Sequence, residues 1–440
     1  MKSKILMCIA VLTLFTVALP VQLAAQHARY KLIDIPTLGG PAAAGNVDCN
    51  ECAQFINNPG VVVGGSDSSI HDPNAPNCGN LDCFLTHAFR WQDGILTDLG
   101  TLPGVNFSHA TSINARGWAT GGSGTAEIDP QKFIWRNGVM QDLGTLGGAD
   151  SFPTGGCNNE RSDLVVGWSF TNSTANSSTG LPTQHAFFWD HGTMTNIPTL
   201  GGTSAYAQCA NNRGQVIGFS NLTGDVGCNG SLDSCAVHTF LWDHETLQDL
   251  GTLGGTSSVP LWLNNNGEAV GGALTADDKE FHATLWKNGR ITDLNGEGDC
   301  FSFATAINSS HQIIGNTFNC DTDTFRMVLW KNGSIIDLNA AIPSNSSLFL
   351  IEPDNINDRG EIVGRGAPPG CDNLDLCGHV FLLIPCDSAG TQGCEENTET
   401  TARTSATTAT KHHHTAEEFV ALWRARLAHP YHMRGITPRN

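Results

Sequence analysis

The stretch "YKLIDIPTLGG" (Tyr30–Gly40) stands near the start of a sequence of 440 residues, yet it reads like the end of a longer segment. "GTMTNIPTLGG" (Gly192–Gly202) and "TLQDLGTLGG" (Thr246–Gly255) carry the same phrase, and each closes a longer unit. Internal repeats with periods of 20–50 residues indicate repeat architectures such as solenoids and propellers. The fold therefore has to explain why a closing phrase precedes every complete unit.

The closing phrase recurs at a regular spacing. Leu250, Leu294 and Leu338 hold the same place in it and follow one another at intervals of 44 residues. Other intervals are longer, which indicates insertions within the units. The position is occupied by Leu99, Leu143, Ile197, Leu250, Leu294 and Leu338.

Each unit consists of four pieces of β-strand length. The first ends in an Asn with a Gly three residues later, as in "SINARG" (Ser112–Gly117), and the second is a β-rich run such as "QVIGF" (Gln215–Phe219). The third resembles "HAFRW" (His87–Trp91), and the fourth follows a tight turn, as in "KNGRITDLN" (Lys287–Asn295). Asn-Gly supplies the two positive-φ residues of a hairpin turn. Each unit therefore predicts a four-stranded antiparallel sheet. The length of the unit is typical of a β-propeller blade.

The number of pieces explains the early closing phrase. Seven copies of the first three pieces are present, but only six copies of the fourth follow them, because the pattern stops after "HVFLLIPC" (His379–Cys386). "YKLIDI" (Tyr30–Ile35) supplies the seventh copy, and its pairing with the last unit would remove exposed sheet edges. The sequence predicts an all-β fold, a seven-bladed β-propeller of four-stranded blades closed by the N-terminal strand.

Two complete phrases carry a family resemblance. "THAFRWQDGILTDLGTLPG" and "QHAFFWDHGTMTNIPTLGG" resemble the bacterial extracellular repeat family named after its His-Ala-Phe (HAF) motif. The resemblance extends roughly from Tyr30 to Pro385. The last two units depart from it, because "RMVLW" (Arg326–Trp330) lacks the His and "HVFLL" (His379–Leu383) lacks the Trp. The resemblance implies secretion and a β-repeat fold and leaves the function open.

The two ends differ in composition from the repeats. Residues 1–25 have a basic start, an apolar stretch and a small-residue end, which predicts a signal peptide cleaved near Ala25. A membrane anchor is the alternative, but the apolar run is short and contains Pro20 at its end. We expect the propeller at residues 29–386, a polar Thr-rich linker at 387–411, and a short amphipathic helix with a tail at 412–440. No later segment is apolar enough to cross a membrane.

Cysteines support an oxidising compartment. Of the 15 cysteines, all but Cys8 lie beyond the signal peptide, and this even number in a secreted chain predicts disulfides. Structural zinc at "CNEC" (Cys49–Cys52) is the alternative, but no second close pair of that spacing accompanies it. Many disulfide connectivities are possible, and one of them pairs cysteines that would be neighbours in a propeller. Its pairs are Cys49–Cys52, Cys78–Cys83, Cys157–Cys209, Cys228–Cys235, Cys300–Cys320, Cys371–Cys377 and Cys386–Cys394.

Residues that recur once per unit indicate packing, because a catalytic group is needed once per site. We expect the repeated Trp to fill the space between blades, with its indole N–H bonded to a partner. The repeated His is expected to bond a neighbouring turn, and the repeated Asp, matched by Asp34, has the same structural interpretation. These residues are His87, His185, His238, His282, His379, Trp91, Trp135, Trp189, Trp242, Trp286, Trp330, Asp98, Asp142, Asp249, Asp293 and Asp337.

Ligand binding is expected on the face with the long second-to-third-strand loops, because function in such scaffolds usually lies where loops vary. Aromatic residues cluster there before the first strands, at the expected mouth of the channel. They suit a stacking platform for a sugar or peptide, with packing between blades as the alternative. Carboxylates of "CDTDTF" (Cys320–Phe325) leave calcium open as a cofactor, without a full loop motif. The candidate ligand-binding residues are Phe107, His109, Phe152, Tyr206, Phe301 and Phe303.

Charge and motifs narrow the function. A formal net charge of −19 disfavours nucleic acid, and no nucleophile motif, phosphate loop or metalloprotease helix is present. We predict a secreted, monomeric binding or scaffolding module for an extracellular carbohydrate or protein. A polysaccharide lyase or glycoside hydrolase at the channel mouth is one alternative, with Glu352, Asp354 and His311 as residues unique to one unit. A purely structural surface protein is the other.

Overall fold

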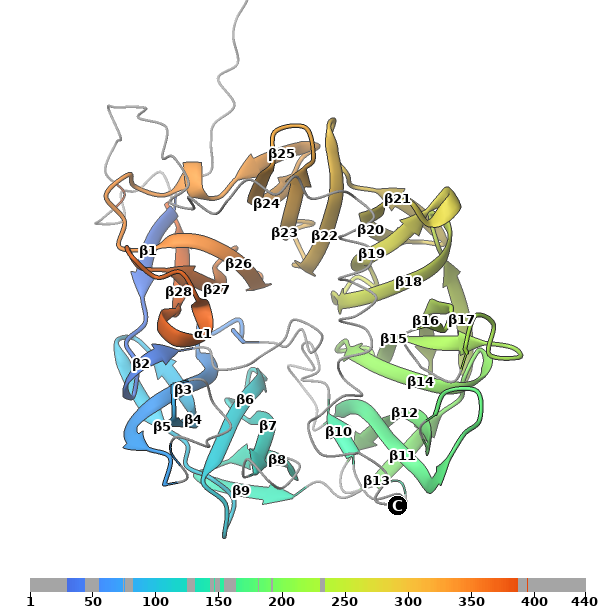
Figure 1. Ribbon diagram of the computed structural model, residues 1–440, viewed down its shortest axis with the longest axis horizontal. Coiled ribbons are helices and arrows are strands. Elements are labelled where there is room, and N and C mark those ends of the chain that lie inside the picture. The colour runs from blue at the N-terminus through green and yellow to red at the C-terminus, as the bar shows by residue number, and fades with distance from the viewer. Residues whose placement is uncertain are drawn as a thin grey trace, which may run out of the picture.

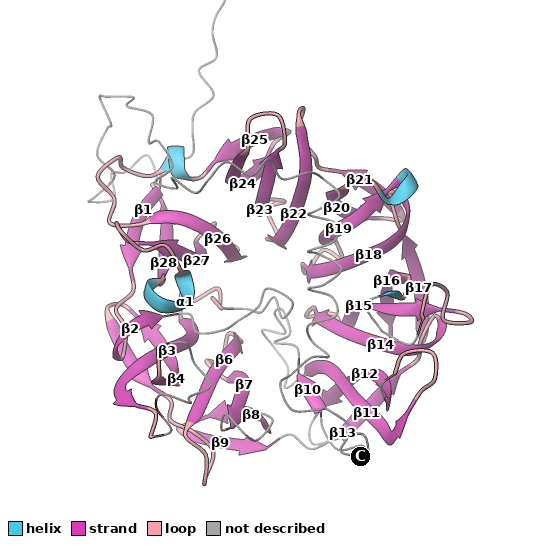
Figure 2. Ribbon diagram, viewed as in Figure 1, coloured by secondary structure: helices cyan, strands magenta, loops and turns pink. Residues whose placement is uncertain are grey.

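The computed structural model describes residues 30–386, except 44–54, 74, 76–81, 125–130, 143–145, 147–150, 154–163, 181, 191–192 and 230–233, together with residue 394. The signal peptide and the C-terminal linker and helix expected from the sequence lie outside the described residues. Almost every described element is a β-strand (Figure 2). The one described α-helix is the short α1 (Leu374–Cys377). No described helix has the length and apolar character needed to span a membrane.

Strands follow one another in groups of four along the chain. The early groups are β2 (Gly39–Ala43), β3 (Val62–His71), β4 (Phe84–Gln92) and β5 (Ile95–Asp98); then β6 (Phe107–Ile113), β7 (Ala119–Gly124), β8 (Gln131–Arg136) and β9 (Val139–Asp142); then β10 (Ser151–Pro153), β11 (Val165–Ala175), β12 (Pro182–Asp190) and β13 (Thr193–Ile197). Each group forms antiparallel ladders between consecutive strands.

The later groups have the same organisation. They are β14 (Gly201–Ala210), β15 (Gln215–Leu222), β16 (Val237–Asp243) and β17 (Thr246–Gly251); then β18 (Gly254–Leu263), β19 (Ala269–Thr275), β20 (Phe281–Lys287) and β21 (Arg290–Asp293); then β22 (Asp299–Ile307), β23 (Ile313–Asn319), β24 (Thr324–Lys331) and β25 (Ser334–Asp337). Single parallel pairs, Gln184 with Ser204 and Phe281 with Phe301, join neighbouring groups into two larger sheets.

The last group contains the first strand of the chain. β26 (Phe349–Ile356), β27 (Ile362–Ala367) and β28 (His379–Pro385) form a sheet whose fourth strand is β1 (Tyr30–Asp34). β1 runs antiparallel to β28, with Tyr30 opposite Pro385 and Asp34 opposite Phe381. The backbone N–H of Ile35 continues this pairing by donating to Val380 O at 3.0 Å. The pairing of the early closing phrase with the last unit, predicted from the sequence, is therefore present.

The sheets are arranged around a common centre, with β14, β18, β22 and β26 on the inner side (Figure 1). In each group the first-to-second and third-to-fourth turns lie at one end of the strands, and the second-to-third loops lie at the other end. We call these ends the turn face and the loop face. The arrangement is that of a β-propeller, in which radial repetition leaves only short sheet edges.

The core repeats with the units. The aromatic residue of the third strand is fully buried in most groups, and a small residue in the second strand makes room for it. A Cβ on Gly218 would lie 2.6 Å from Phe240 Cζ and 1.9 Å from Tyr206 O, so no larger residue fits there. The buried aromatics at this position are Phe89, Phe133, Phe187, Phe240 and Phe381.

Disulfides join four of the predicted cysteine pairs. They are Cys228–Cys235, Cys300–Cys320, Cys371–Cys377 and Cys386–Cys394. Cys83 and Cys209 are also disulfide-bonded, but their predicted partners, Cys78 and Cys157, lie outside the described residues, as do Cys49 and Cys52. Disulfides form and persist in oxidising compartments, which indicates that the protein functions outside the cytoplasm.

Candidate functional site

The repeated histidines pair with the repeated aspartates. His238 Nδ1 on the third strand lies 2.9 Å from Asp249 Oδ2 on the adjacent fourth strand. Equivalent contacts join His87 to Asp98 at 2.9 Å and His282 to Asp293 at 2.7 Å. The strand register places the two side chains opposite each other, 11 residues apart in the sequence. The expected bond to a neighbouring turn is present as well in two cases, since His87 bonds the backbone of Asn106 and His282 Nε2 lies 3.2 Å from Asn295 Nδ2.

The same pair closes the first and last strands. His379 Nδ1 lies 2.9 Å from Asp34 Oδ1, although the two residues are 345 positions apart. His185 is the exception among the histidines, since its Nδ1 lies 2.9 Å from the uncharged Asn196 Oδ1. One contact repeated in five groups of strands supports the structural role predicted for these residues.

The contact between His87 and Asp98 shifts the pKa of both partners. A hydrogen bond to Asp98 raises the pKa of His87, although burial opposes the shift. Burial would raise the pKa of Asp98, but the hydrogen bonds from His87 and from the Gly100 N–H outweigh it and leave the pKa lowered. The pair therefore favours a charged His at acidic pH.

A chain of asparagines connects neighbouring sheets on the turn face. In each described case the buried Asn side chain accepts N–H bonds from its own turn, while its Nδ2 donates to the backbone of the equivalent Asn in the next sheet. Asn264 Nδ2, for example, donates to Asn308 O at 3.1 Å, and Asn264 Oδ1 accepts from Glu268 N at 2.9 Å. The other described links are Asn57 to Asn114, Asn211 to Asn264, Asn308 to Asn357, and Asn357 to Asn57.

The last of these links crosses the ends of the chain. Asn357 Nδ2 donates to Asn57 O at 3.1 Å, 300 positions away in the sequence. The Asn that marks the first piece of every repeat therefore has a clear purpose. Its side-chain oxygen accepts hydrogen bonds from the N–H groups of its own turn, and its Nδ2 binds that turn to the adjacent sheet. Without these bonds the buried amide would be unsatisfied, which would destabilise the fold.

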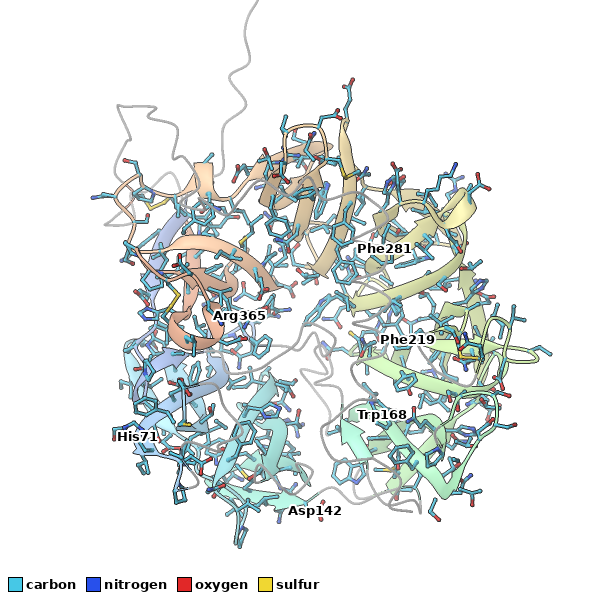
Figure 3. All side chains as sticks on the ribbon, viewed as in Figure 1. His71, Asp142, Trp168, Phe219, Phe281 and Arg365 are labelled. Atoms are coloured by element: carbon cyan, nitrogen blue, oxygen red, sulfur yellow. A yellow bond between two sulfur atoms is a disulfide. The ribbon has the colours of Figure 1, made fainter. Side chains whose placement is uncertain are left out.

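The predicted aromatic residues lie on the inner strands but not on one open surface. Tyr206 is 3% exposed, and its ring stacks on Phe219 at 4.8 Å between centroids. Phe301 and Phe303 are partly buried and lie 5.8 and 5.6 Å from the ring of Phe281. These side chains belong to one apolar cluster with Trp168, Phe219 and Phe281, which succeed one another along the ring in Figure 3.

The remaining predicted aromatics lie elsewhere. Phe107 and His109 are partly buried neighbours on β6, with ring centroids 5.5 Å apart. Phe152 lies on β10, and its side chain is outside the described part of the structure. A shared stacking platform made of all six residues stays a prediction.

Two carboxylates unique to one sheet lie where the first and last sheets meet. Glu352 accepts from Arg365 Nε at 2.7 Å, and Asp354 lines a narrow cleft with Arg365, Phe55 and Val63. We call this the closure cleft; Figure 3 labels its Arg365. Its volume of about 10 Å³ admits roughly one water molecule. Burial raises the pKa of Asp354 to about 7, opposed by Arg365 and assisted by Glu352.

A second acid pair lies near the loop face of the first sheet. Burial, and then a hydrogen bond and charge repulsion from Asp82, raise the pKa of Asp67 to about 7. Thr86 Oγ1 and the Ala42 N–H donate to the same Asp67 carboxyl group at 2.9 and 3.1 Å. Asp67, on β3, is therefore a buried carboxyl group whose hydrogen bonds hold β2, β3 and β4 together.

A larger pocket opens on the turn face between the β14–β17 sheet and the β18–β21 sheet. Its volume of about 400 Å³ lies in the range of small-molecule sites. Most of its polar lining is cationic or amide. We call it the basic pocket, and its polar side chains are Arg213, Gln215, Gln248, Asp249, Asn266, Lys287, Asn288 and Arg290.

The charges of this pocket are partly neutralised. Lys287 forms an ion pair with Glu268, whose other oxygen lies 2.6 Å from His311 Nδ1. Burial opposes the ionisation of Glu268, but Lys287, Asn264 and His311 together lower its pKa. Both carboxylate oxygens of Asp249 are engaged by His238 and the Gly251 N–H.

The contact with Glu268 explains why a His occupies position 311, which the sequence marked as unique to one unit. His311 takes φ = 60°, the left-handed conformation that Gly267 and Gly360 adopt at the equivalent turn position of other sheets. A side chain is unfavourable there, and the contact with Glu268 offsets the cost. His311 therefore anchors a turn.

Two arginines of the pocket have no such partner. Arg290 is exposed and makes no hydrogen bond or ion pair with a described residue, and the same holds for the Arg213 side chain. The Arg213 guanidinium lies so close to Gly267 that a side chain at position 267 would collide with it. Arg213 therefore reaches across the boundary from one sheet to the next and presents its charge in the pocket.

The indole of Trp286 differs from its equivalent in the next sheet. Trp330 Nε1 donates to Leu294 O at 2.9 Å, as expected for a buried Trp. Trp286 and Leu250 hold the same repeat positions and both line the basic pocket, yet the buried Trp286 Nε1 has no hydrogen-bond partner among the described residues. An unsatisfied buried donor is uncommon in proteins, so this indole distinguishes Trp286 from Trp330.

Sequence reasoning missed this pocket because it lies on the face with short, regular turns. Cations are scarce in the chain, with 23 Lys and Arg against 42 Asp and Glu. Arg213, Lys287 and Arg290 nonetheless fall in the turns of two consecutive units, and that coincidence was the available signal. Within the described residues, no group of three or more His, Cys, Asp or Glu side chains is placed to hold a metal ion; calcium at Cys320–Phe325 stays an untested prediction.

Known proteins that resemble this one do so in structure, at low sequence identity. No protein-family model matches the chain, and no curated protein matches it. The structure is similar to the β-propeller domain of the Trilobed protease from Pyrococcus furiosus, with 7% identity, a TM-score of 0.46, and coverage of 81% of this chain and 95% of that one. It is also similar to a gluconolactonase from Xanthomonas campestris (7% identity, TM-score 0.33, 81% and 90% coverage) and to TolB from Acinetobacter baumannii (11%, 0.36, 62% and 65%).

Proposed function

We propose that this protein is a secreted, seven-bladed β-propeller, closed by its N-terminal strand, that acts as a binding module for an extracellular ligand. Seven groups of four strands, counted with β1 in the last group, support the blade number. The β1–β28 pairing and the Asn357–Asn57 hydrogen bond support closure of the ring. The disulfides and the N-terminal sequence support secretion.

The observation that carries the binding function is the basic pocket. It combines concave shape, a volume of about 400 Å³, two arginines that form no direct ion pair with a described residue, and several amide side chains. A few polar groups in a preformed concavity are the usual features of a ligand site. A carbohydrate or a segment of an extracellular protein would both suit these groups.

A hydrolase is the second candidate, and the raised pKa of Asp354 is the observation in its favour. A glycoside hydrolase needs a carboxylic acid and a carboxylate about 5–10 Å apart on either side of a sugar. Asp354 lines the closure cleft and Glu352 is bonded to Arg365 beside it, but the cleft's volume of about 10 Å³ is far too small for a sugar ring. The binding function is therefore the better supported.

The experiment that tests this proposal is a glycan array probed with the purified, disulfide-intact protein, with a second array of extracellular proteins in parallel. We expect saturable binding to a defined class on one of the two arrays and no release of reducing sugar during long incubation. Silence on both arrays would contradict the binding function, and sugar release that Asp354→Asn abolishes would establish the hydrolase.

A further inference from the structure

We propose that the basic pocket binds an anionic sugar unit of an extracellular polysaccharide, one carrying a carboxylate or a sulfate group. This proposal rests on the binding function above and specifies its ligand class. It follows from three independent features: the sign of the charge, the supply of hydrogen-bonding groups and the shape of the pocket.

The charge of the pocket is opposite to that of the molecule. The chain carries a formal net charge of −19, which repels anions from most of its surface. Arg213 and Arg290 face the same concavity from two different sheets. Neither forms a direct ion pair with a described residue, although Asp243 interacts with the charge of Arg213. Arginine binds planar carboxylates and sulfates through paired N–H donors. An anionic group between these two side chains would satisfy both.

Polar side chains around the arginines can form hydrogen bonds with the hydroxyl groups of a sugar. Gln248 and Asn288 line the pocket, and their side chains make no hydrogen bond with a described residue. Each amide offers both donors and acceptors, which matches the mixed donor and acceptor character of a sugar hydroxyl.

The shape favours a sugar over a protein surface. The walls are formed by turns of two adjacent sheets, Arg213–Gln215 and Trp286–Arg290, and enclose a cavity rather than a flat area. Protein interfaces are usually flat and bury about 800 Å² on each partner. A single sugar residue, or the end of a chain, fits the concavity. An acidic peptide is the competing occupant, and the experiment below includes it.

The repeat supplies variants that preserve the turns. Arg213→Asn converts the turn "NNRG" (Asn211–Gly214) into "NNNG", which occurs at Asn264–Gly267. Arg290→Ser converts "KNGR" (Lys287–Arg290) into "KNGS", which occurs at Lys331–Ser334. Both changes remove a positive charge from the pocket and install a residue that the same turn already accepts. Arg116→Asn makes the equivalent change in the β6–β9 sheet, outside the pocket, and is the matched control.

The test measures binding by isothermal titration calorimetry at low and at physiological salt. The probes are hexagalacturonate, which carries carboxylates, a κ-carrageenan hexasaccharide, which carries sulfates, neutral galactohexaose, and a hexaglutamate peptide. We expect at least one anionic sugar to bind ten times more tightly than the neutral one. Arg213→Asn and Arg290→Ser should each weaken that binding roughly tenfold or more, and added salt should weaken it further. Arg116→Asn should leave the affinity unchanged, and all three variants should keep the thermal unfolding midpoint.

Several outcomes would overturn the proposal. Equal binding of galactohexaose would show that charge is not recognised, while the binding function itself would stand. Binding of hexaglutamate alone would identify an acidic peptide as the occupant. Anionic sugar binding that neither arginine variant weakens would place the site elsewhere. A preference between the carboxylated and sulfated sugars identifies which anion the pocket takes.

Discussion

The turn face and the loop face of this protein are built on different principles. The turn face repeats one solution, an Asn that binds its own turn and the backbone of the next sheet, at every described boundary from Asn211 to Asn57. The loop face differs from sheet to sheet and relies on local disulfides such as Cys228–Cys235 and Cys371–Cys377. Regularity on the turn face makes any deviation there informative.

The basic pocket is such a deviation. At one boundary Trp330 bonds Leu294, and at the neighbouring boundary the equivalent Trp286 is left without a partner beside a cationic cavity. The long loops drew the prediction from the sequence, whereas the site proposed above lies on the face with regular turns. The proposal rests on variation among equivalent positions of the repeat and not on loop length.

Removal of the N-terminal strand should have the largest effect on stability. Deletion of Tyr30–Gly40 removes β1 and leaves the β26–β28 sheet with an unpaired edge and exposed apolar side chains. We expect loss of the single cooperative transition in differential scanning calorimetry. Lys31→Ala, in the same strand, is the control and should shift the midpoint little. An unchanged melting curve for the deletion would refute closure of the ring by β1.

Loss of one link in the asparagine chain should be the next largest effect. Asn357→Ala removes the bonds to Asn57 O and to the N–H groups of Arg359 and Glu361 from a site that is 1% exposed. We expect the free energy of unfolding to fall by about 3 kcal/mol. Urea unfolding measures it, with the exposed Asn345→Ala as the control. A loss no greater than that of the control would mean that the turn face is not held by these bonds.

Asp354 should make stability depend on pH. Its pKa of about 7 in the folded protein lies above the ordinary value of 3.8, so the folded state holds the proton more tightly than the unfolded state. The contribution of Asp354 to the free energy of unfolding therefore falls as the pH rises from about 4 to 7 and stays low above that. Asp354→Asn should be more stable than the wild type at pH 8, by roughly 2 kcal/mol, and nearly equal at pH 4.

The exposed Asp372→Asn is the control for this change, measured by urea unfolding across the same pH range. If Asp354→Asn and the wild type differ equally at pH 4 and pH 8, the closure cleft does not hold a protonated acid.

The His–Asp pairs on the loop face should give the smallest effect. The pKa of His87 is raised by Asp98, so the stability that the charged pair adds is present at acidic pH and is lost as the pH rises past the raised pKa. His87→Ala should cost up to about 1 kcal/mol at pH 5 and less at pH 8, because the pair is partly exposed. His185→Ala, whose partner Asn196 is uncharged, should show a weaker pH dependence in the same thermal melts. The reverse ranking would contradict the electrostatic origin of the effect.

Much of the fold could be predicted from the sequence because the same pattern of strands and turns occurs in several units. The four pieces of each unit, the hairpin turns and the role of Tyr30–Ile35 could be read from spacing alone. Four disulfides also followed from proximity in the repeat. The site did not follow, because it depends on which side chains meet across a boundary. Arg213 and Arg290 are 77 positions apart, and nothing in the local pattern of either indicates that they share a pocket.

The aromatic residues illustrate the same limit. Tyr206 and Phe303 occupy comparable repeat positions, which were predicted to lie in the connections before the first strands; the structure places both residues within the inner strands β14 and β22. Their burial in a cluster with Phe281 depends on side-chain packing between sheets, which spacing does not determine. The cross-strand partner of each repeated His was likewise missed, because strand register determines it.

Hydrogen–deuterium exchange with and without hexagalacturonate tests most directly whether the ligand site lies on the turn face. Exchange reports the protection of backbone amides, so it locates the bound sugar without a substitution in the chain. We predict slower exchange in peptides covering Arg213–Gln215, Asn266–Glu268 and Trp286–Arg290, and unchanged exchange in the loop-face segments 66–73 and 366–378. Protection confined to the loop-face segments, with the turns of the basic pocket unaffected, would contradict the account.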